Sequence, residues 1–239
     1  MRLLITNCNT TESMTKEIEA GARLAASPGT EIVARTPRWG PESAEGWLDS
    51  FLSAAAVLDL LRELTEAGER FDAVVLAGFG EHGREGAREL LGVPVVDITE
   101  AAAHLACLLG RRYAVVTTLD RTRGLIEDSL HTAGVAANCV AVLGAGLGVL
   151  ELGDEGRTAS ALLTAGRRAR DRGAEVLVLG CAGMTGLDRR ISAELGVPVV
   201  DGVAAAVRLA ESCVALGLST SRAGSYAAPL PKERRWRPV

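Results

Sequence analysis

Residues 91–97 read Leu-Gly-Val-Pro-Val-Val-Asp, and residues 195–201 repeat this stretch without a single change. Each copy follows an apolar run that ends in a glycine-rich turn, DAVVLAGFG at 72–80 and EVLVLGCAG at 175–183. One structural unit therefore occurs twice in the chain, at an offset of roughly a hundred residues. Aligning the two runs sets Gly78 opposite Cys181. If the two units face each other, we expect a cleft with a thiol on one side and a hole on the other.

Short apolar runs alternate with longer segments of helical period along the chain. Near-continuous apolar strands that alternate with helices are typical of parallel sheets covered on both faces. The sequence therefore predicts an α/β protein of two pseudo-symmetric lobes, each with a short parallel sheet flanked by helices. We expect lobe 1 to span 1–97 and 207–239 and lobe 2 to span 98–206, because the last long helix returns to the first lobe. Strands are expected at 3–6, 31–34, 73–77, 93–96, 113–118, 139–143, 176–180 and 197–200, and helices at 12–25, 43–67, 84–91, 100–109, 120–133, 155–172, 187–195 and 203–216.

The composition indicates a protein with a substantial core and no face suited to polyanions. The 239 residues are 48% hydrophobic, and the formal net charge is −4 at pH 7. Aromatic residues make up 3% of the chain, so few side chains could stack on bases, and we expect no nucleic-acid partner. No apolar run approaches the roughly 18 residues of a membrane span, and the apolar N-terminal run is too short for a signal-peptide core. We expect a cytoplasmic protein without a membrane partner.

The cysteines do not form a disulfide or zinc pattern. Their number is odd, they are widely scattered, and no CxxC pair occurs among Cys8, Cys107, Cys139, Cys181 and Cys213. The three histidines also lack ligand spacing with cysteines or carboxylates. The GAGLG run at 144–148 lacks the helix start and the acidic partner of a dinucleotide fingerprint. We predict no metal and no cofactor.

In open parallel sheets, ligands bind beyond the carboxyl ends of the strands. The loops expected there carry amides, hydroxyls and free backbone N–H groups, and few fixed charges. They are NCNTT at 7–11, PRWGP at 37–41, GFGEHG at 78–83, TT at 117–118 and CAGM at 181–184. A cleft lined by such loops suits a small polar molecule that carries carbonyl oxygens.

Cys181 is the residue most strongly indicated for chemistry. It ends a buried strand, and Thr185-x-x-Asp188 just beyond it reads as a helix capping box. A helix N-terminus beside the sulfur would favour the thiolate. The alternative is that Cys181 is a small buried hydrophobe. For the other four cysteines packing is the better interpretation, although the loop that carries Cys8 should reach the cleft.

Six motifs, taken in order, carry a resemblance to a known family. They are Asn7-x-Asn9-Thr10, GPESAEG at 40–46, Phe79-Gly80, VVTTL at 115–119, VLGCAGM at 178–184, and LSTS at 218–221 followed by Tyr226. Together they resemble the hydantoin and allantoin racemase branch of the aspartate/glutamate racemase superfamily. The resemblance implies a two-lobe α/β fold, a homo-oligomer, and cofactor-independent chemistry on a carbon acid in the cleft between the lobes. In that family two cysteines act, one removing the α-proton and the other returning a proton on the opposite face.

The resemblance assigns roles only where the residues match. Cys181 keeps the proton-transfer position. The uncharged residues beside the two cysteine positions favour a neutral, hydantoin-like ring as the small-molecule substrate over a zwitterionic amino acid. The groups that would hold this substrate are Asn9, Thr10, Pro41, Thr117, Thr118 and the backbone at Phe79, Gly80, Ala182 and Gly183.

The chain departs from the family pattern at the first cysteine. The family's Cys-Phe-Gly-Asp-Pro-Gly loop is here Gly78-Phe79-Gly80-Glu81-His82-Gly83, and the proline of its Asn-Pro-Asn turn is Cys8.

Three interpretations of this departure follow. The leading one is an isomerase in which His82, Cys8 or water serves the second face of the carbon acid. The second is a one-cysteine decarboxylase of a malonate-like acid, similar to the arylmalonate decarboxylases, which have a glycine opposite their cysteine. The third is a repurposed ligand-binding relative. On the first interpretation, a cysteine placed at position 78 should create or accelerate racemisation.

Overall fold

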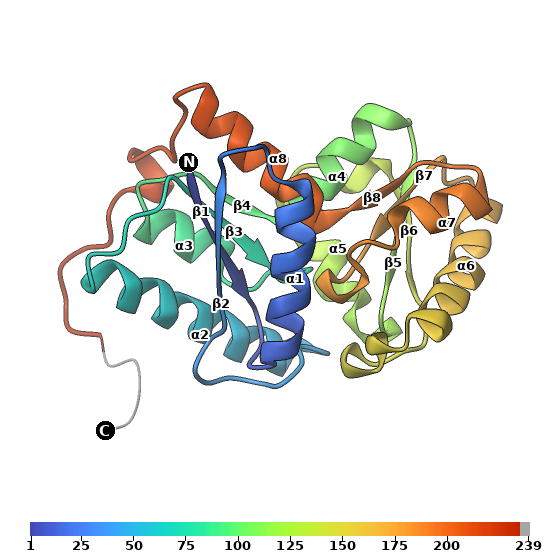
Figure 1. Ribbon diagram of the computed structural model, residues 1–239, viewed down its shortest axis with the longest axis horizontal. Helices are drawn as coiled ribbons and strands as arrows, with labels where there is room; N and C mark the ends of the chain where they lie inside the picture. The colour runs from blue at the N-terminus through green and yellow to red at the C-terminus, as the bar shows by residue number, and fades with distance from the viewer. Residues whose placement is uncertain (235–239) are drawn as a thin grey trace.

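The structure, a computed structural model, describes residues 1–234 and consists of two lobes that each contain one parallel sheet (Figure 1). The first sheet has the strand order β2-β1-β3-β4 and the second has the order β6-β5-β7-β8, so the lobes share one topology. The predicted fold class, α/β with two pseudo-symmetric lobes and short parallel sheets, is confirmed. The strands are β1 (Arg2–Asn7), β2 (Glu31–Arg35), β3 (Ala73–Ala77), β4 (Val95–Asp97), β5 (Tyr113–Thr117), β6 (Cys139–Gly144), β7 (Val176–Leu179) and β8 (Val199–Asp201).

The repeated LGVPVVD stretch forms the edge strand β4 in one lobe and β8 in the other. Proline is tolerated at such an edge because its missing N–H would face away from the sheet. Its carbonyl group still pairs inward: the Val74 N–H donates to Pro94 O, and the Leu177 N–H donates to Pro198 O, at 2.9 Å in both lobes. The identical sequence therefore makes an identical ladder contact twice.

Helices cover both sheets (Figure 1). The final aspartate of each repeat begins a helix: Asp97 accepts from the Glu100 N–H, and Asp201 accepts from the Val203 and Ala204 N–H groups. The second helix starts four residues later than predicted, because residues 43–46 form a bend that ends at the extended Gly46. The helices are α1 (Glu12–Ala25), α2 (Trp47–Glu66), α3 (Arg84–Leu90), α4 (Ile98–Leu109), α5 (Arg123–Thr132), α6 (Glu155–Asp171), α7 (Asp188–Leu195) and α8 (Gly202–Ala215).

The two helices that follow the repeats cross between the lobes. Helix α4 packs against β7 and α5 of the second lobe, α8 packs against α1 and β3 of the first, and the two helices pack on each other. Small buried side chains such as Ala102, Ala106 and Ala206 allow this close approach. One hydrophobic cluster therefore runs through both lobes.

The lobe boundaries, 1–97 with 207–239 and 98–206, stay a prediction, and residues 235–239 lie outside the described part of the chain. None of the described helices is both long and apolar enough to cross a membrane.

Candidate active site

A cavity between the lobes is lined by residues that follow the central strands β1, β3, β5 and β7. Gly78 and Cys181 both line it, as do Cys8, Asn9 and Thr118. Within each sheet the central strands are paired up to their carboxyl ends, which places the loops that follow them side by side. Among the described residues, no aspartate, glutamate, lysine or arginine lines this cavity. The site is polar but carries no fixed charge, as the loop composition predicts.

The hole expected at Gly78 is filled. A Cβ atom on Gly78 would lie 2.4 Å from His82 Cδ2, 2.8 Å from Cys8 Cβ and 3.0 Å from Cys8 Sγ. Cβ atoms essentially never make nonbonded contacts shorter than 3.0 Å, so no side chain fits here unless its neighbours move. The expectation that Gly78 faces only empty space is therefore wrong, because side chains from β1's loop and from position 82 occupy the volume that the glycine leaves.

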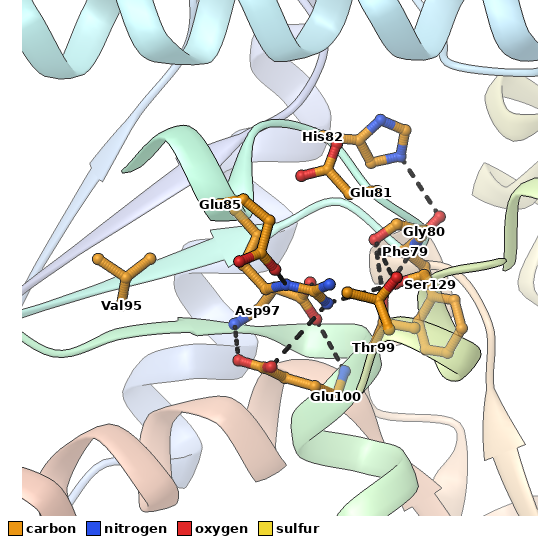
Figure 2. A network of polar contacts seen from close by, with 12 residues as sticks. Phe79, Gly80, Glu81, His82, Glu85, Val95, Asp97, Thr99, Glu100 and Ser129 are labelled. Atoms are coloured by element: carbon orange, nitrogen blue, oxygen red, sulfur yellow. Dashed lines mark hydrogen bonds and ion pairs between the residues drawn. The ribbon is translucent and has the colours of Figure 1, made fainter. Parts of the chain in front are cut away.

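His82 belongs to the third loop, residues 78–83 after β3, where it is buried and held at both ring nitrogens. Its Nδ1 lies 3.3 Å from Ser50 Oγ, and its Nε2 lies 3.3 Å from Phe79 O, a contact that Figure 2 shows. The Ser50 hydroxyl donates to Glu81 O at 2.7 Å, so its oxygen faces His82 as an acceptor. Burial lowers the pKa of His82. The neutral ring can donate to only one of its two oxygen neighbours.

Cys181 stands at the end of β7, partly exposed and lining the cavity. Burial raises the pKa of its thiol to about 11; the Gly183 N–H opposes this shift, and the charge of Glu45 adds to it. The predicted capping box does not form, because the Thr185 hydroxyl donates to Asp201 and α7 begins at Asp188 without a side-chain cap. The expectation of a thiol ionised by a nearby helix end is therefore wrong. The free thiol is the stable form at neutral pH.

Cys8 follows β1 directly and is buried, with one side open to the same cavity. Burial raises the pKa of its thiol to about 12, and the charge of Cys181 is the second cause. The two sulfurs therefore lie near enough that ionisation of one opposes ionisation of the other.

The amide of Asn9 is oriented by Asn7, a buried residue of the same turn that sequence reasoning did not include among the site residues. Asn7 Nδ2 donates to Asn9 Oδ1 at 2.9 Å, and the Thr11 N–H donates to the same oxygen at 3.0 Å. Within residues 1–234, the only acceptor of the Asn9 Nδ2 group is Met14 Sδ, at 3.6 Å, and sulfur is a weak acceptor. Asn9 therefore keeps a strong donor for a ligand. The Asn-x-Asn spacing was the signal that could have identified Asn7.

Further hydrogen-bond donors line the cavity at the ends of β3, β5 and β7. Thr118 is buried, and its hydroxyl has no hydrogen-bond partner among residues 1–234. The N–H groups of Phe79 and Ala182 likewise donate to no acceptor in that range. The Thr117 hydroxyl, in contrast, donates to Gly180 O at 3.1 Å. Thr117 therefore holds two strand ends together, although it lines the cavity as well.

The structure does not bring four of the predicted substrate-binding residues to the cavity wall. Thr10 uses both its N–H and its hydroxyl on Pro41 O, at 3.0 and 3.3 Å, so these two residues join neighbouring loops. The Gly80 N–H donates to Thr99 Oγ1 at 2.8 Å and is not free for a substrate. Gly183 acts on Cys181 through its N–H rather than on the cavity.

A buried ionic network supports the third loop from below, as Figure 2 shows. Arg84 Nη1 donates to Asp97 Oδ2 at 2.8 Å and to Ser129 Oγ at 3.3 Å. Ser129 and Thr99 both donate to Gly80 O, at 3.3 and 3.1 Å. Burial raises the pKa of Asp97 to about 7, and Arg84 opposes this shift. Sequence reasoning missed this network, since nothing in the REGAREL helix distinguishes an inward arginine from a solvated one.

No group of three or more histidine, cysteine, aspartate or glutamate side chains within residues 1–234 is arranged to hold a metal ion. The chemistry available at this cavity is that of two thiols, the imidazole of His82 and uncharged hydrogen-bond donors.

Comparison with known proteins agrees with this geometry. The Asp/Glu/Hydantoin racemase family matches residues 3–210. The crystal structure of allantoin racemase from Pseudomonas fluorescens is 54% identical, with a TM-score of 0.94, and the match covers 98% of this chain and 100% of that one. Allantoin racemase from Klebsiella pneumoniae is 42% identical, with a TM-score of 0.93 and coverage of 98% and 96%. A hydantoin racemase from Pseudomonas sp. (strain NS671) is 39% identical over 98% of this chain and 94% of its own. The chain therefore belongs to the Asp/Glu/hydantoin racemase family.

Proposed function

We propose that this protein racemises a neutral five-membered ring of the hydantoin class, such as allantoin or a 5-substituted hydantoin, without a cofactor. The observation that carries the proposal is a cavity with a thiol at the end of β7 and uncharged donors around it, in a chain that resembles allantoin racemase along almost its whole length. A zwitterionic amino acid would need charged partners, and the described residues place none on the cavity wall. The ring's carbonyl and N–H groups need only hydrogen bonds.

The reaction turns on the acidity of the ring carbon next to a carbonyl group. Removing its proton pushes negative charge onto the carbonyl oxygen, and one well-placed donor at such an oxygen contributes about 3–4 kcal/mol to the transition state. Asn9 Nδ2, Thr118 Oγ1 and the Phe79 and Ala182 N–H groups are donors at this cavity that no strong acceptor among the described residues satisfies. We assign the proton transfer on one face to Cys181.

The one-cysteine decarboxylase and the non-catalytic binder gain no support from the structure. The decarboxylase followed from an empty side at Gly78 and the binder from the missing first cysteine, whereas the space at Gly78 is occupied by the side chains of Cys8 and His82. We also propose a cytoplasmic location, as expected from the sequence, and a homo-oligomer, as the family resemblance implies. Light scattering coupled to size exclusion would measure the mass of the oligomer.

The test is proton exchange on enantiopure allantoin and 5-substituted hydantoins in deuterium oxide, followed by proton NMR and by optical rotation. We expect deuterium to enter the ring carbon while rotation is lost, faster than in an enzyme-free blank. Disubstituted malonates serve as the competing panel, and release of carbon dioxide from them would contradict the proposal. Cys181→Ser should abolish racemisation, seen as retained optical rotation, whereas Cys213→Ser, on α8 away from the cavity, should still racemise the substrate.

A further inference from the structure

We propose that Cys8 is the second proton-transfer residue, serving the face of the ring opposite Cys181 from the end of β1 in place of a side chain at position 78. This inference rests on the proposed racemase function and deepens it, because it names the group that serves the other face.

Inversion at a carbon acid needs a proton acceptor on one face and a proton donor on the other. Three titratable side chains line the cavity among residues 1–234: Cys8, His82 and Cys181. If Cys181 serves one face, the group for the other face is therefore Cys8, His82 or solvent.

The contacts of His82 exclude it as the proton carrier. Both of its ring nitrogens lie against oxygens of the chain, Ser50 Oγ and Phe79 O, each at 3.3 Å. The atom that it directs toward position 78 is Cδ2, a carbon that carries no exchangeable proton. His82 fills space beside Cys8 and closes the wall behind it.

Cys8 has the position that the chemistry requires. In the ladder between β1 and β3, Asn7 stands next to Ala77, so the residues after them, Cys8 and Gly78, begin adjacent loops. Cys8 Sγ lies 3.0 Å from the point where a Gly78 Cβ atom would stand. The sulfur thus reaches from the neighbouring strand into the volume that a side chain at 78 would fill. Gly78 is the residue that the repeat sets opposite Cys181.

Gly78 is then a requirement of this arrangement. Any larger residue would displace Cys8 or His82, since its Cβ atom would lie within 3.0 Å of both side chains. The Cys8 thiol after β1 and the glycine after β3 fit together, and the Cys181 thiol after β7 lines the same cavity from the other lobe.

The step balances without a further reactant. In one direction the Cys8 thiolate takes the proton from the ring carbon, so that an S–H bond forms, the C–H bond breaks, and the electron pair moves to the carbonyl oxygen. The Cys181 thiol then donates its proton to the other face of the carbon, and its S–H bond breaks. The protein is left with the thiol and thiolate exchanged, and proton exchange with water restores the starting form.

The electrostatics of the pair oppose two thiolates at once, so the reactive form carries one thiolate and one thiol. The charge of Cys181 raises the pKa of Cys8, so a proton lost from one sulfur holds the proton on the other. Each direction of the reaction begins from one of the two singly ionised forms.

The experiment compares the two mirror-image substrates in deuterium oxide with Cys8→Ala, Cys181→Ala and the control Cys213→Ala. Wild type and the control should exchange the ring proton of both enantiomers with inversion. Each cavity variant should lose racemisation by roughly 100-fold or more, the usual contribution of one acid–base group. Cys8→Ala should still exchange the proton of one enantiomer with retention, and Cys181→Ala should still exchange that of the other.

The retained half-reaction separates a catalytic role from a structural one. A variant that merely misfolded would lose exchange on both enantiomers, and its circular dichroism and melting temperature would show this. If Cys8→Ala misfolds, the role of Cys8 is tested with Cys8→Ser, which keeps the shape of the side chain. Normal racemisation by a folded Cys8 variant would overturn the assignment and leave solvent as the second group, with the racemase function intact. No exchange by wild type on any hydantoin would instead overturn the proposed function and this inference with it.

Discussion

Cys8 Sγ lies 3.0 Å from the point at which Gly78 would carry a Cβ atom, so a side chain from one strand occupies the place that the next strand leaves free. This relationship changes what should be expected of mutations at the third loop. Position 78 has no side chain, but the space beside it is occupied by Cys8 from the neighbouring loop and by His82.

Gly78→Cys alone should not create a better racemase, contrary to the expectation from sequence. The new Cβ atom would overlap His82 Cδ2 and Cys8 Cβ, and overpacking of this kind costs about 1–3 kcal/mol. We expect a lower melting temperature and no gain in the racemisation rate. Combining Gly78→Cys with Cys8→Gly and His82→Ala removes the overlapping atoms and should restore the melting temperature. A stable and faster single variant would show that the two side chains move aside freely.

The racemisation rate should rise with pH across the neutral and mildly alkaline range. The pKa of Cys181 is raised to about 11 by burial, so the thiolate fraction of the free enzyme grows about tenfold per pH unit below that value. We expect log(kcat/KM) to rise with a slope near one after the enzyme-free rate is subtracted. The charge of Glu45 adds to the rise in the pKa of Cys181, and Cys8 is coupled to Cys181 because the charge of Cys181 raises the pKa of Cys8. A plateau reached near neutrality would contradict a buried thiol as the base.

The free energy of unfolding should fall as the solution becomes alkaline. Burial raises the pKa of Cys8 to about 12 and of Cys181 to about 11, from an ordinary value of 9.0. Between pH 9 and 11 the unfolded chain releases these protons and the folded chain retains them, so unfolding is favoured increasingly as pH rises. Urea titrations at several pH values would measure the slope. In the double variant Cys8→Ala, Cys181→Ala the slope should be smaller; an unchanged slope would assign it to other groups.

Arg84→Ala should destabilise the protein strongly and disturb the third loop. It leaves the Asp97 carboxylate buried without its cation, and breaking a buried pair in this way typically costs 3–5 kcal/mol. The Ser129 hydroxyl, which bridges Arg84 and Gly80 O, loses one partner as well. Thermal unfolding measures the loss. Arg190→Ala, which removes an exposed ion pair with Glu155, is the matched control and should cost less than about 1 kcal/mol.

The fold was predictable because the two copies of LGVPVVD could be compared within one chain. The repeat implied one structural unit used twice, and the apolar runs implied parallel sheets, both of which the structure shows. Boundaries were less predictable. The edge strands β4 and β8 each begin two residues later than expected, directly after the proline. Proline has no N–H group, so it cannot donate a hydrogen bond to the neighbouring strand.

The site was predictable at the level of loops and less so at the level of side chains. Strand ends determine which loops meet, so Cys181, Asn9 and Thr118 could be placed together from sequence. What a glycine makes room for depends on side chains from other strands, and no alignment of the repeats shows that Cys8 enters the volume at Gly78. The hydrogen bond from the Gly80 N–H to Thr99 Oγ1 likewise joins residues that are 19 positions apart in the sequence.

The crossing of α4 and α8 has a consequence for how this protein can come apart. Each half of the chain ends in a helix that shields the other half's sheet, so neither half alone could cover its own apolar strands. Severed halves would be expected to reassociate by reciprocal exchange of these helices, as domain-swapped partners do. Because one hydrophobic cluster runs through both halves, we expect the chain to melt in one concerted transition rather than two.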